Sequence, residues 1–317
     1  MKEVSFIRQN IEKWKSLEKI VDDAASHNPV ELADAYTDIT TDLSFSRSHY
    51  PDSRITIYLN SLALALHNHL YKTKKEKASR LLTFWTQEVP DAINLSHKEL
   101  LYSFLIFVIS VAIGVISTIN DDSFVRLIAG NDYIDMTLRN IENGTPMAVY
   151  GSEPELTMFL NITFNNIKVS FIVFALGIFT GFGTGGALFY NGVMLGAIQT
   201  FFFQNGVGIE SMQAIWLHGT LEVSAIIITG AAGLALGNGW LFPGTYSRVY
   251  AFRQGAKRGL KIVIGLVPMF LVAGFIESYV PHYTELSIFM RFYIIFISYA
   301  TVAFYYIVIP KFRNYGI

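Results

Sequence analysis

The chain has 317 residues, of which 52% are hydrophobic and 15% are charged, and its mean hydropathy is +0.38. Soluble domains carry about 25% charged residues, so this composition excludes an ordinary soluble protein and predicts an integral membrane protein. The net charge of -1 leaves no basic excess for binding nucleic acid. The absence of cysteine excludes disulfides, thiolate metal sites and a cysteine nucleophile.

Residues 1–98 are predicted to form a cytoplasmic helical domain. Apolar residues recur there at helical spacing between charged ones. Asn28 followed by Pro29 is typical of a helix start, and Pro90 is expected to end the last helix. The first residues lack the apolar run of a signal peptide, so the N-terminus is expected to stay in the cytoplasm.

The next two segments differ sharply in charge. Residues 99–119 contain no charge after Glu99 and are long enough for a first membrane-spanning helix. Residues 120–166 are polar and acidic, and are expected to lie outside the cytoplasm. Their many apolar side chains predict a partly helical, ordered segment rather than a loose tether.

Residues 167–317 are predicted to form a five-helix transmembrane domain. The uncharged run 169–209 is rich in glycine, and reads either as two full spans or as a pair of re-entrant helices. The span Gln213–Gly237 follows, and then a basic cytoplasmic loop near 238–261. Two further spans follow, Ile262–Tyr279, which Pro268 is expected to kink, and Phe289–Ile309. They return the C-terminus to the cytoplasm. The expected fold is all-α: a polytopic helical protein of a bacterial inner membrane, with about six transmembrane helices.

Ionisable residues at membrane depth indicate the candidate site. His218 and Glu222 lie four residues apart and share one helix face, and charged groups in a span usually face protein or water. With Asn191 and Gln199 they form the predicted intramembrane polar site. Asn165, Asn166 and Lys168 form a second predicted cluster at the entrance of a span. In the alternative interpretation, His218 and Glu222 only fix helix packing.

Several stretches resemble the stage II sporulation protein M family of integral membrane proteins. They are FIRQNIEKWKSLE at 6–18, SRITIYLNSLALALHNHLY at 53–71, DMTLRNIENGTPMAVYGSEPELTMFLNITFNNIKV at 135–169, LFYNGVMLGAIQ at 188–199, LHGTLEVSAIIITGAAGLALG at 217–237 and PGTYSR at 243–248. The resemblance implies a polytopic membrane protein without a defined active site. It also implies assembly with proteins that remodel the cell envelope.

Three functions compete at this point. The first is a membrane scaffold or accessory subunit that binds protein partners through its cytoplasmic domain or its extracytoplasmic segment. The second is a transporter or lipid-handling protein that uses the polar intramembrane site. The third, an intramembrane hydrolase, needs a nucleophile with a base or three metal ligands, and His218 and Glu222 supply only two. No catalytic residue, metal site, cofactor or nucleic-acid partner is expected. Membrane lipids are expected to contact the chain, and a homo-oligomer is one open alternative.

Overall fold

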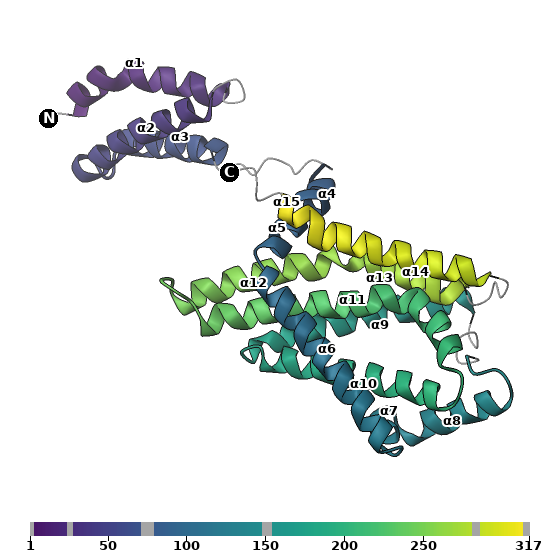
Figure 1. Cartoon of the computed structure of the whole chain (residues 1–317). Coiled ribbons are helices and arrows are strands. Elements are labelled where there is room, and N and C mark those ends of the chain that lie inside the picture. Colours follow the sequence, from purple (N-terminus) through teal and green to yellow (C-terminus); the bar gives the residue numbers. More distant parts are fainter. Residues whose placement is uncertain (1–2, 24–27, 71–78, 148–153, 281–285, 313–317) are drawn as a thin grey trace. The chain divides into compact units, whose positions relative to one another are not determined.

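The computed structural model describes residues 3–23, 28–70, 79–147, 154–280 and 286–312 (Figure 1). The chain divides into two compact units, Met1–Ser79 and Arg80–Ile317. Within the described ranges every regular element is a helix, which confirms the all-α fold class. The first compact unit ends at Ser79, whereas the predicted cytoplasmic domain extends to residue 98.

The first unit consists of three helices around its own apolar core. They are α1 (Glu3–Asp22), α2 (Pro29–His49) and α3 (Arg54–Leu70). Trp14, Ile39 and Leu66 are fully buried at their contact, and Trp14 Nε1 donates a 2.8 Å hydrogen bond to the Asp42 carboxylate. The predicted start of α2 is confirmed, because the Asn28 side chain accepts a 3.0 Å hydrogen bond from the Val30 amide.

The second unit opens with a helical run that passes through Pro90. Its parts are α4 (Ser79–Thr83), a π-helical turn η1 (Phe84–Glu88) and α5 (Val89–Asn94). Proline cannot donate a backbone hydrogen bond and crowds the carbonyl four residues earlier, and the wider π turn before Pro90 accommodates both effects. Pro90 therefore does not end the helix, contrary to the sequence prediction.

This opening run packs on the later helices of the second unit. Trp85 Nε1 donates to the Gly265 carbonyl at 3.3 Å, and Tyr305 donates to the Trp85 carbonyl at 2.5 Å. Lys261 forms a 2.8 Å ion pair with Glu88. The hydrogen bond from Lys261 holds the pKa of Glu88 below its usual value. Residues after Ser79 thus belong structurally with the membrane helices.

Six helices among the described residues are long and apolar enough to cross a membrane, in agreement with the predicted number. The spans are α6 (His97–Asn120), α9 with η2 (Glu155–Ile178), α10 (Phe182–Gln204), α11 (Gly208–Leu241), α12 with α13 (Arg248–Tyr279) and α14 with η4 and α15 (Ile288–Phe312). The second span begins at Glu155 rather than at 167. Most of the predicted basic loop is the first part of α12, which starts at Arg248.

The glycine-rich run forms the end of the second span and the whole of α10. The chain reverses between them at Gly181, whose φ of 83° lies in the left-handed region that glycine favours. Because both flanking helices are long enough to cross a bilayer, the structure favours two full spans over a re-entrant pair. The break predicted near Pro268 is also present, between α12 (Arg248–Gly265) and α13 (Val267–Tyr279).

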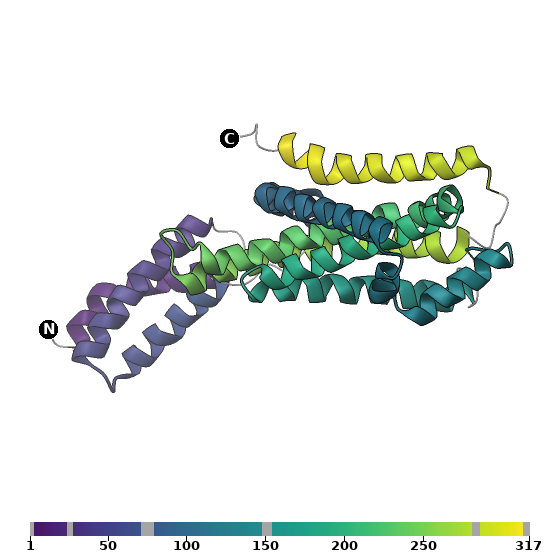
Figure 2. The ribbon, with the colours of Figure 1, turned by 60° about the horizontal axis from the view of Figure 1, so that its bottom comes forward.

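Helix α11 is the axis of the membrane unit. It contacts each of the other five spans, and both ribbon views show it surrounded by them (Figures 1 and 2). Its buried positions include Ala225, Ala231, Ala232 and Ala235, which have no exposed surface. Small residues let helix backbones approach closely within a membrane. Alanine and glycine on α11 therefore permit contact with neighbours on all sides.

Glycines also set the contact between α6 and α10. Gly192 and Gly196 lie four residues apart on α10 and face Ser110 and Val111 of α6, while Gly114 of α6 faces the backbone of Val193. A Cβ added at Gly196 would collide with the Val111 carbonyl oxygen. The two backbones touch here, as in other pairs of membrane helices with small residues at this spacing.

Two short helices cover one end of α10. They are α7 (Phe124–Ala129) and α8 (Asn131–Glu142), in the segment expected to be extracytoplasmic. Val125 and Ile134 are buried in one cluster with Phe201 of α10, and Arg126 pairs with Asp135 at 2.6 Å. Within this segment, α7 and α8 are therefore held by packing on the membrane unit.

Candidate functional site

Three membrane helices bring four polar side chains together. His218 and Glu222 come from α11, Glu277 from α13 and Asn166 from α9. Each of these helices packs on the other two. Gly274 permits the approach of α13 to α9, because an added Cβ there would collide with Thr163 Oγ1. We call this group the polar cluster.

The side chains of the polar cluster lie close together and are largely shielded from solvent. His218 Nε2 lies 3.8 Å from Glu277 Oε1, and the two side chains are 7% and 13% exposed. Asn166 Nδ2 donates a hydrogen bond to Glu222 Oε1, and the carboxyl groups of Glu222 and Glu277 are within hydrogen-bonding distance of each other. One ligand atom from each of His218, Glu222 and Glu277 lies within 4.8 Å of the other two.

Such an arrangement needs a cation. Two ionised carboxylates this close repel each other strongly away from water. A proton shared between Glu222 and Glu277 removes the repulsion, and so does a metal ion. Imidazole and two carboxylates are a ligand set that suits zinc, and Asn166 would then orient Glu222 from outside the metal. The chemistry open to the cluster is therefore binding and release of a positive charge at membrane depth.

The structure brings together only some of the residues predicted for the site. Asn166 joins His218 and Glu222, whereas Asn165 and Lys168 are exposed on the surface of α9. Asn191 donates a 2.8 Å hydrogen bond to Ala187 in its own helix. Gln199 donates a 2.8 Å hydrogen bond to Ser211. Asn191 and Gln199 thus form these hydrogen bonds with residues outside the polar cluster.

Glu277 was missing from the predicted site. It supplies the third ligand atom that His218 and Glu222 alone lacked. The available signal was an acidic residue near the end of the span Ile262–Tyr279, where charged side chains are costly. Nothing in the local sequence relates Glu277 to His218, however, because they lie on different helices.

A second polar contact was also not predicted. Arg258 of α12 donates to the Leu95 carbonyl at 2.9 Å and lies 3.5 Å from Glu99 Oε1. Asn238 of α11 donates to the same Glu99 oxygen at 3.1 Å. These residues join α6, α11 and α12 near their ends. Arg258 thus holds two elements of the bundle through its terminal nitrogens, which points to a structural role.

Comparison with known protein families agrees with the fold, and the matched range includes the polar cluster. The model of the family described as Stage II sporulation protein M matches residues 103–281, more than half of the chain. The chain belongs to the stage II sporulation protein M family. All four residues of the polar cluster lie within the matched range, and they are carried by spans of this multi-pass membrane protein.

The stage II sporulation protein M match does not extend over the first unit. A second model, described as a domain of unknown function (DUF8413), matches residues 4–72. The resembling stretches at 6–18 and 53–71 fall in this second match. No curated protein and no solved structure matches the chain.

Proposed function

We propose that this membrane protein binds a cation at the polar cluster and works as an ion-coupled transporter or lipid-handling protein. The observation that supports the proposal is the convergence of His218, Glu222 and Glu277 from two helices, with their ligand atoms within 4.8 Å. A cluster that served packing alone would carry the cost of burying three ionisable groups, which apolar side chains avoid.

Cation binding can be measured on the purified protein in detergent. We expect titration calorimetry with Zn²⁺ to show one site per chain, and Glu277→Gln to weaken it at least about 100-fold, because one of three ligands is lost. If Zn²⁺ does not bind, the expected cation is a proton, seen as a carboxylic acid band in the infrared spectrum that Glu222→Gln or Glu277→Gln removes.

The matched control is Glu210→Gln. Glu210 lies in the first turn of the same helix α11 and is exposed. It should leave both the calorimetric and the infrared signals unchanged. A protein that shows neither Zn²⁺ binding nor a removable carboxylic acid band would contradict the proposed cation site.

A second candidate function is a scaffold or accessory subunit of a cell-envelope or membrane-remodelling complex. The observation that favours it is the separate unit Met1–Ser79, which has its own core and no ionisable cluster of the kind found in the membrane unit among its described residues. A stoichiometric protein partner recovered from native membrane, and lost on deletion of residues 3–70, would support this role. Copurifying solute or lipid without a protein partner would favour transport.

We also propose an inner-membrane location with both termini in the cytoplasm. The absence of cysteine allows single thiols to be introduced without other changes. Ser123→Cys should react with an impermeant reagent in intact cells, whereas Asp52→Cys and Thr245→Cys should react only after permeabilisation. Thr245 is exposed in the loop before α12 and is therefore suited to labelling. The nearby Ser247 is less suited, because its side chain caps α12 by accepting a 3.4 Å hydrogen bond from the Tyr250 amide. Labelling of Thr245→Cys from outside would contradict this topology.

A further inference from the structure

Helix α9 has one face that the rest of the described membrane unit leaves uncovered. Its exposed residues recur at helical spacing. The apolar ones include Leu160, Phe164 and Ile172, and the polar ones are Asn161, Asn165 and Lys168. Lys168 lies two residues beyond Asn166, about 200° around the helix. Because Asn166 belongs to the polar cluster, this face, which we call the α9 face, points away from that cluster.

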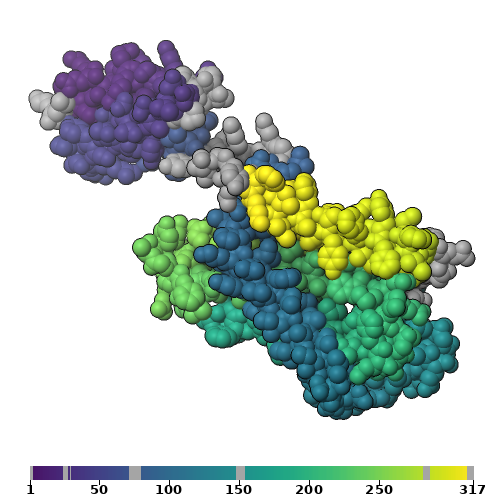
Figure 3. All heavy atoms as spheres, in the orientation of Figure 1, coloured from purple at the N-terminus to yellow at the C-terminus, as the bar shows by residue number. Residues whose placement is uncertain are grey.

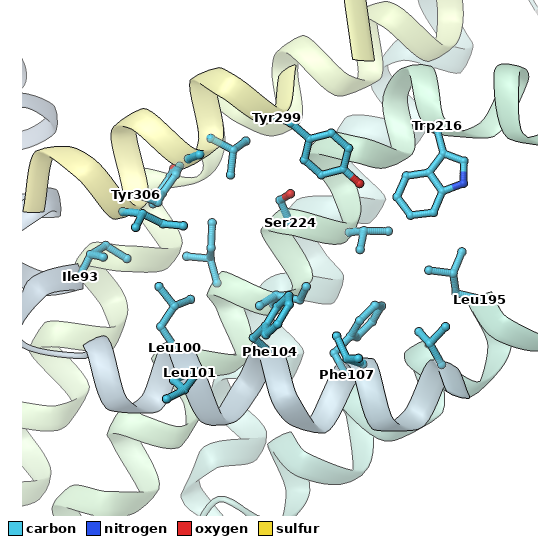
Figure 4. A pocket seen from close by; sticks show the side chains of 18 of the residues that line it. Ile93, Leu100, Leu101, Phe104, Phe107, Leu195, Trp216, Ser224, Tyr299 and Tyr306 are labelled. Carbon is cyan, nitrogen blue, oxygen red and sulfur yellow. The ribbon is translucent and has the colours of Figure 1, made fainter. Parts of the chain in front are cut away.

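The α9 face differs in chemistry from the large hollow of the same unit. The hollow has a volume of about 920 Å³ and is lined by α5, α6, α10, α11 and the last span. Figure 3 shows it between α6 and α14. The side chains labelled in Figure 4 are apolar or aromatic except for Ser224, so they do not distinguish one hydrophobic occupant from another. The α9 face carries a charge, which restricts what can cover it.

Lys168 lies deep in its span. It follows Glu155 by 13 residues and precedes Ile178 by 10, which corresponds to about 20 Å and 15 Å of helix. The neighbouring Asn166 bonds Glu222, which lies in the central part of α11. Lysine side chains reach the lipid headgroups only from near the ends of a helix. Lys168 is therefore too far from both ends to be solvated in that way.

The described structure offers Lys168 and Asn165 no hydrogen-bond or ion-pair partner. An ammonium group that faces hydrocarbon is costly, and charged side chains within spans almost always face protein or water and pair with an opposite charge. Lys168 and Asn165 lie three residues apart, so they are neighbours on the helix surface. Both can therefore donate hydrogen bonds to the same carboxylate.

We propose that the α9 face binds a transmembrane helix of another protein, and that an aspartate or glutamate of that helix accepts hydrogen bonds from Lys168 and Asn165. The exposed apolar side chains of α9 pack on the same helix at the turns before and after this contact. The partner is thus a membrane protein with a carboxylate in the middle of a span. This binding surface is independent of the cation site and of the unit Met1–Ser79.

A second copy of the chain does not supply the required carboxylate. Within the described spans, the carboxylates held in contacts inside one chain are Glu99, Glu222 and Glu277, and those in the first turn of a span are Glu155 and Glu210. Neither group offers a free carboxylate at the depth of Lys168. A symmetric contact between two α9 faces would instead bring two lysines together, and like charges repel strongly away from water.

A designed transmembrane peptide tests whether the α9 face recognises a carboxylate. The probe is a leucine–alanine helix with one central glutamate, and the matched probe has glutamine there. Because the chain has no cysteine, a donor dye can be attached at Thr245→Cys, and energy transfer to labelled peptide is measured in phosphatidylcholine vesicles. We expect the glutamate peptide to bind at least tenfold more tightly than the glutamine peptide to the wild type and to Lys168→Arg. Lys168→Gln should remove this preference.

Two controls separate recognition from folding. Lys257→Gln, at an exposed position of α12, should retain the preference of the wild type. Lys168→Gln should unfold at the same temperature as the wild type or higher, because a charge is removed from membrane depth. Equal binding of the two peptides to the wild type would overturn the proposal, and so would an unchanged preference in Lys168→Gln.

Crosslinking in native membranes identifies what covers the α9 face. The photoreactive residue p-benzoylphenylalanine replaces Phe164, which is 66% exposed, or as a control Phe296 of α14, which is 71% exposed. We expect position 164 to give an adduct with a membrane protein whose crosslinked span carries an aspartate or glutamate. This adduct should persist in Lys168→Arg and fall at least tenfold in Lys168→Gln, whereas adducts at position 296 should not depend on residue 168.

Three results at position 164 would overturn the proposal. They are adducts with lipid alone, an adduct with a span that has no acidic residue, and an adduct between two copies of the chain. The last of these would show that a second copy covers the α9 face instead. The readouts do not involve the polar cluster, so failure of the cation site would leave them unchanged.

Discussion

Replacing Glu222 by glutamine is expected to give a protein that inserts and accumulates normally but no longer complements a deletion strain. Glutamine keeps the size of the side chain and the oxygen that accepts from Asn166. It cannot ionise, so the cluster loses the negative charge that holds a proton or metal ion. A pure packing role predicts near-normal activity instead, because the shape and most hydrogen bonds are preserved.

Three further variants make this result specific to charge. His218→Asn should also fail to complement, and Glu222→Leu should insert at least as well as wild type, because removing a carboxyl group from membrane depth eases partitioning. Glu210→Gln, on the exposed start of the same helix, should complement fully. Full complementation by both Glu222→Gln and His218→Asn at normal expression would refute a role for the ionisable groups.

Gly196→Leu is expected to prevent assembly of the membrane unit, and Gly196→Ala to destabilise it by about 1–3 kcal/mol. The first added atom, Cβ, already collides with the backbone carbonyl oxygen of Val111 in α6. A backbone atom cannot rotate aside as a side chain can. The two helices must therefore separate, and each loses the close packing on which association in a membrane depends.

Gly186 in the same helix provides the matched control. A Cβ added there meets nothing within 4 Å, and alanine favours a helix over glycine by about 0.5–1 kcal/mol. Gly186→Ala should therefore be neutral or slightly stabilising. Thermal unfolding in detergent, followed by size-exclusion profile and helical circular dichroism, measures both variants. Similar melting temperatures for Gly196→Ala and Gly186→Ala would contradict the steric argument.

The sequence predicted those features that depend on neighbouring residues. The start at Asn28 followed the capping pattern, the helix break near Pro268 followed from proline geometry, and the spans α6 and α11 followed from long apolar runs. His218 and Glu222 could be paired because a helix places positions four apart on one face. All of these rest on interactions within a single element.

Features that depend on contacts between helices were not predictable in this way. Glu277 joins the site only because Gly274 lets α13 approach α9. The passage of helix through Pro90 depends on a π turn held by Trp85, whose partners Gly265 and Tyr305 lie far along the chain. Gln199, expected beside His218, instead donates a hydrogen bond to Ser211, because its place is set by how α10 packs on α11.

The length of α11 makes this protein sensitive to bilayer thickness. Its 34 residues extend about 51 Å, whereas the hydrocarbon layer of a membrane is about 30 Å thick. The helix must therefore tilt or project from the membrane, and a thinner bilayer increases the mismatch. Because every other span contacts α11, a change in its tilt would reposition the whole bundle. The depth of His218, about 15 Å along the helix from Gly208, would shift with the lipid composition of the host membrane.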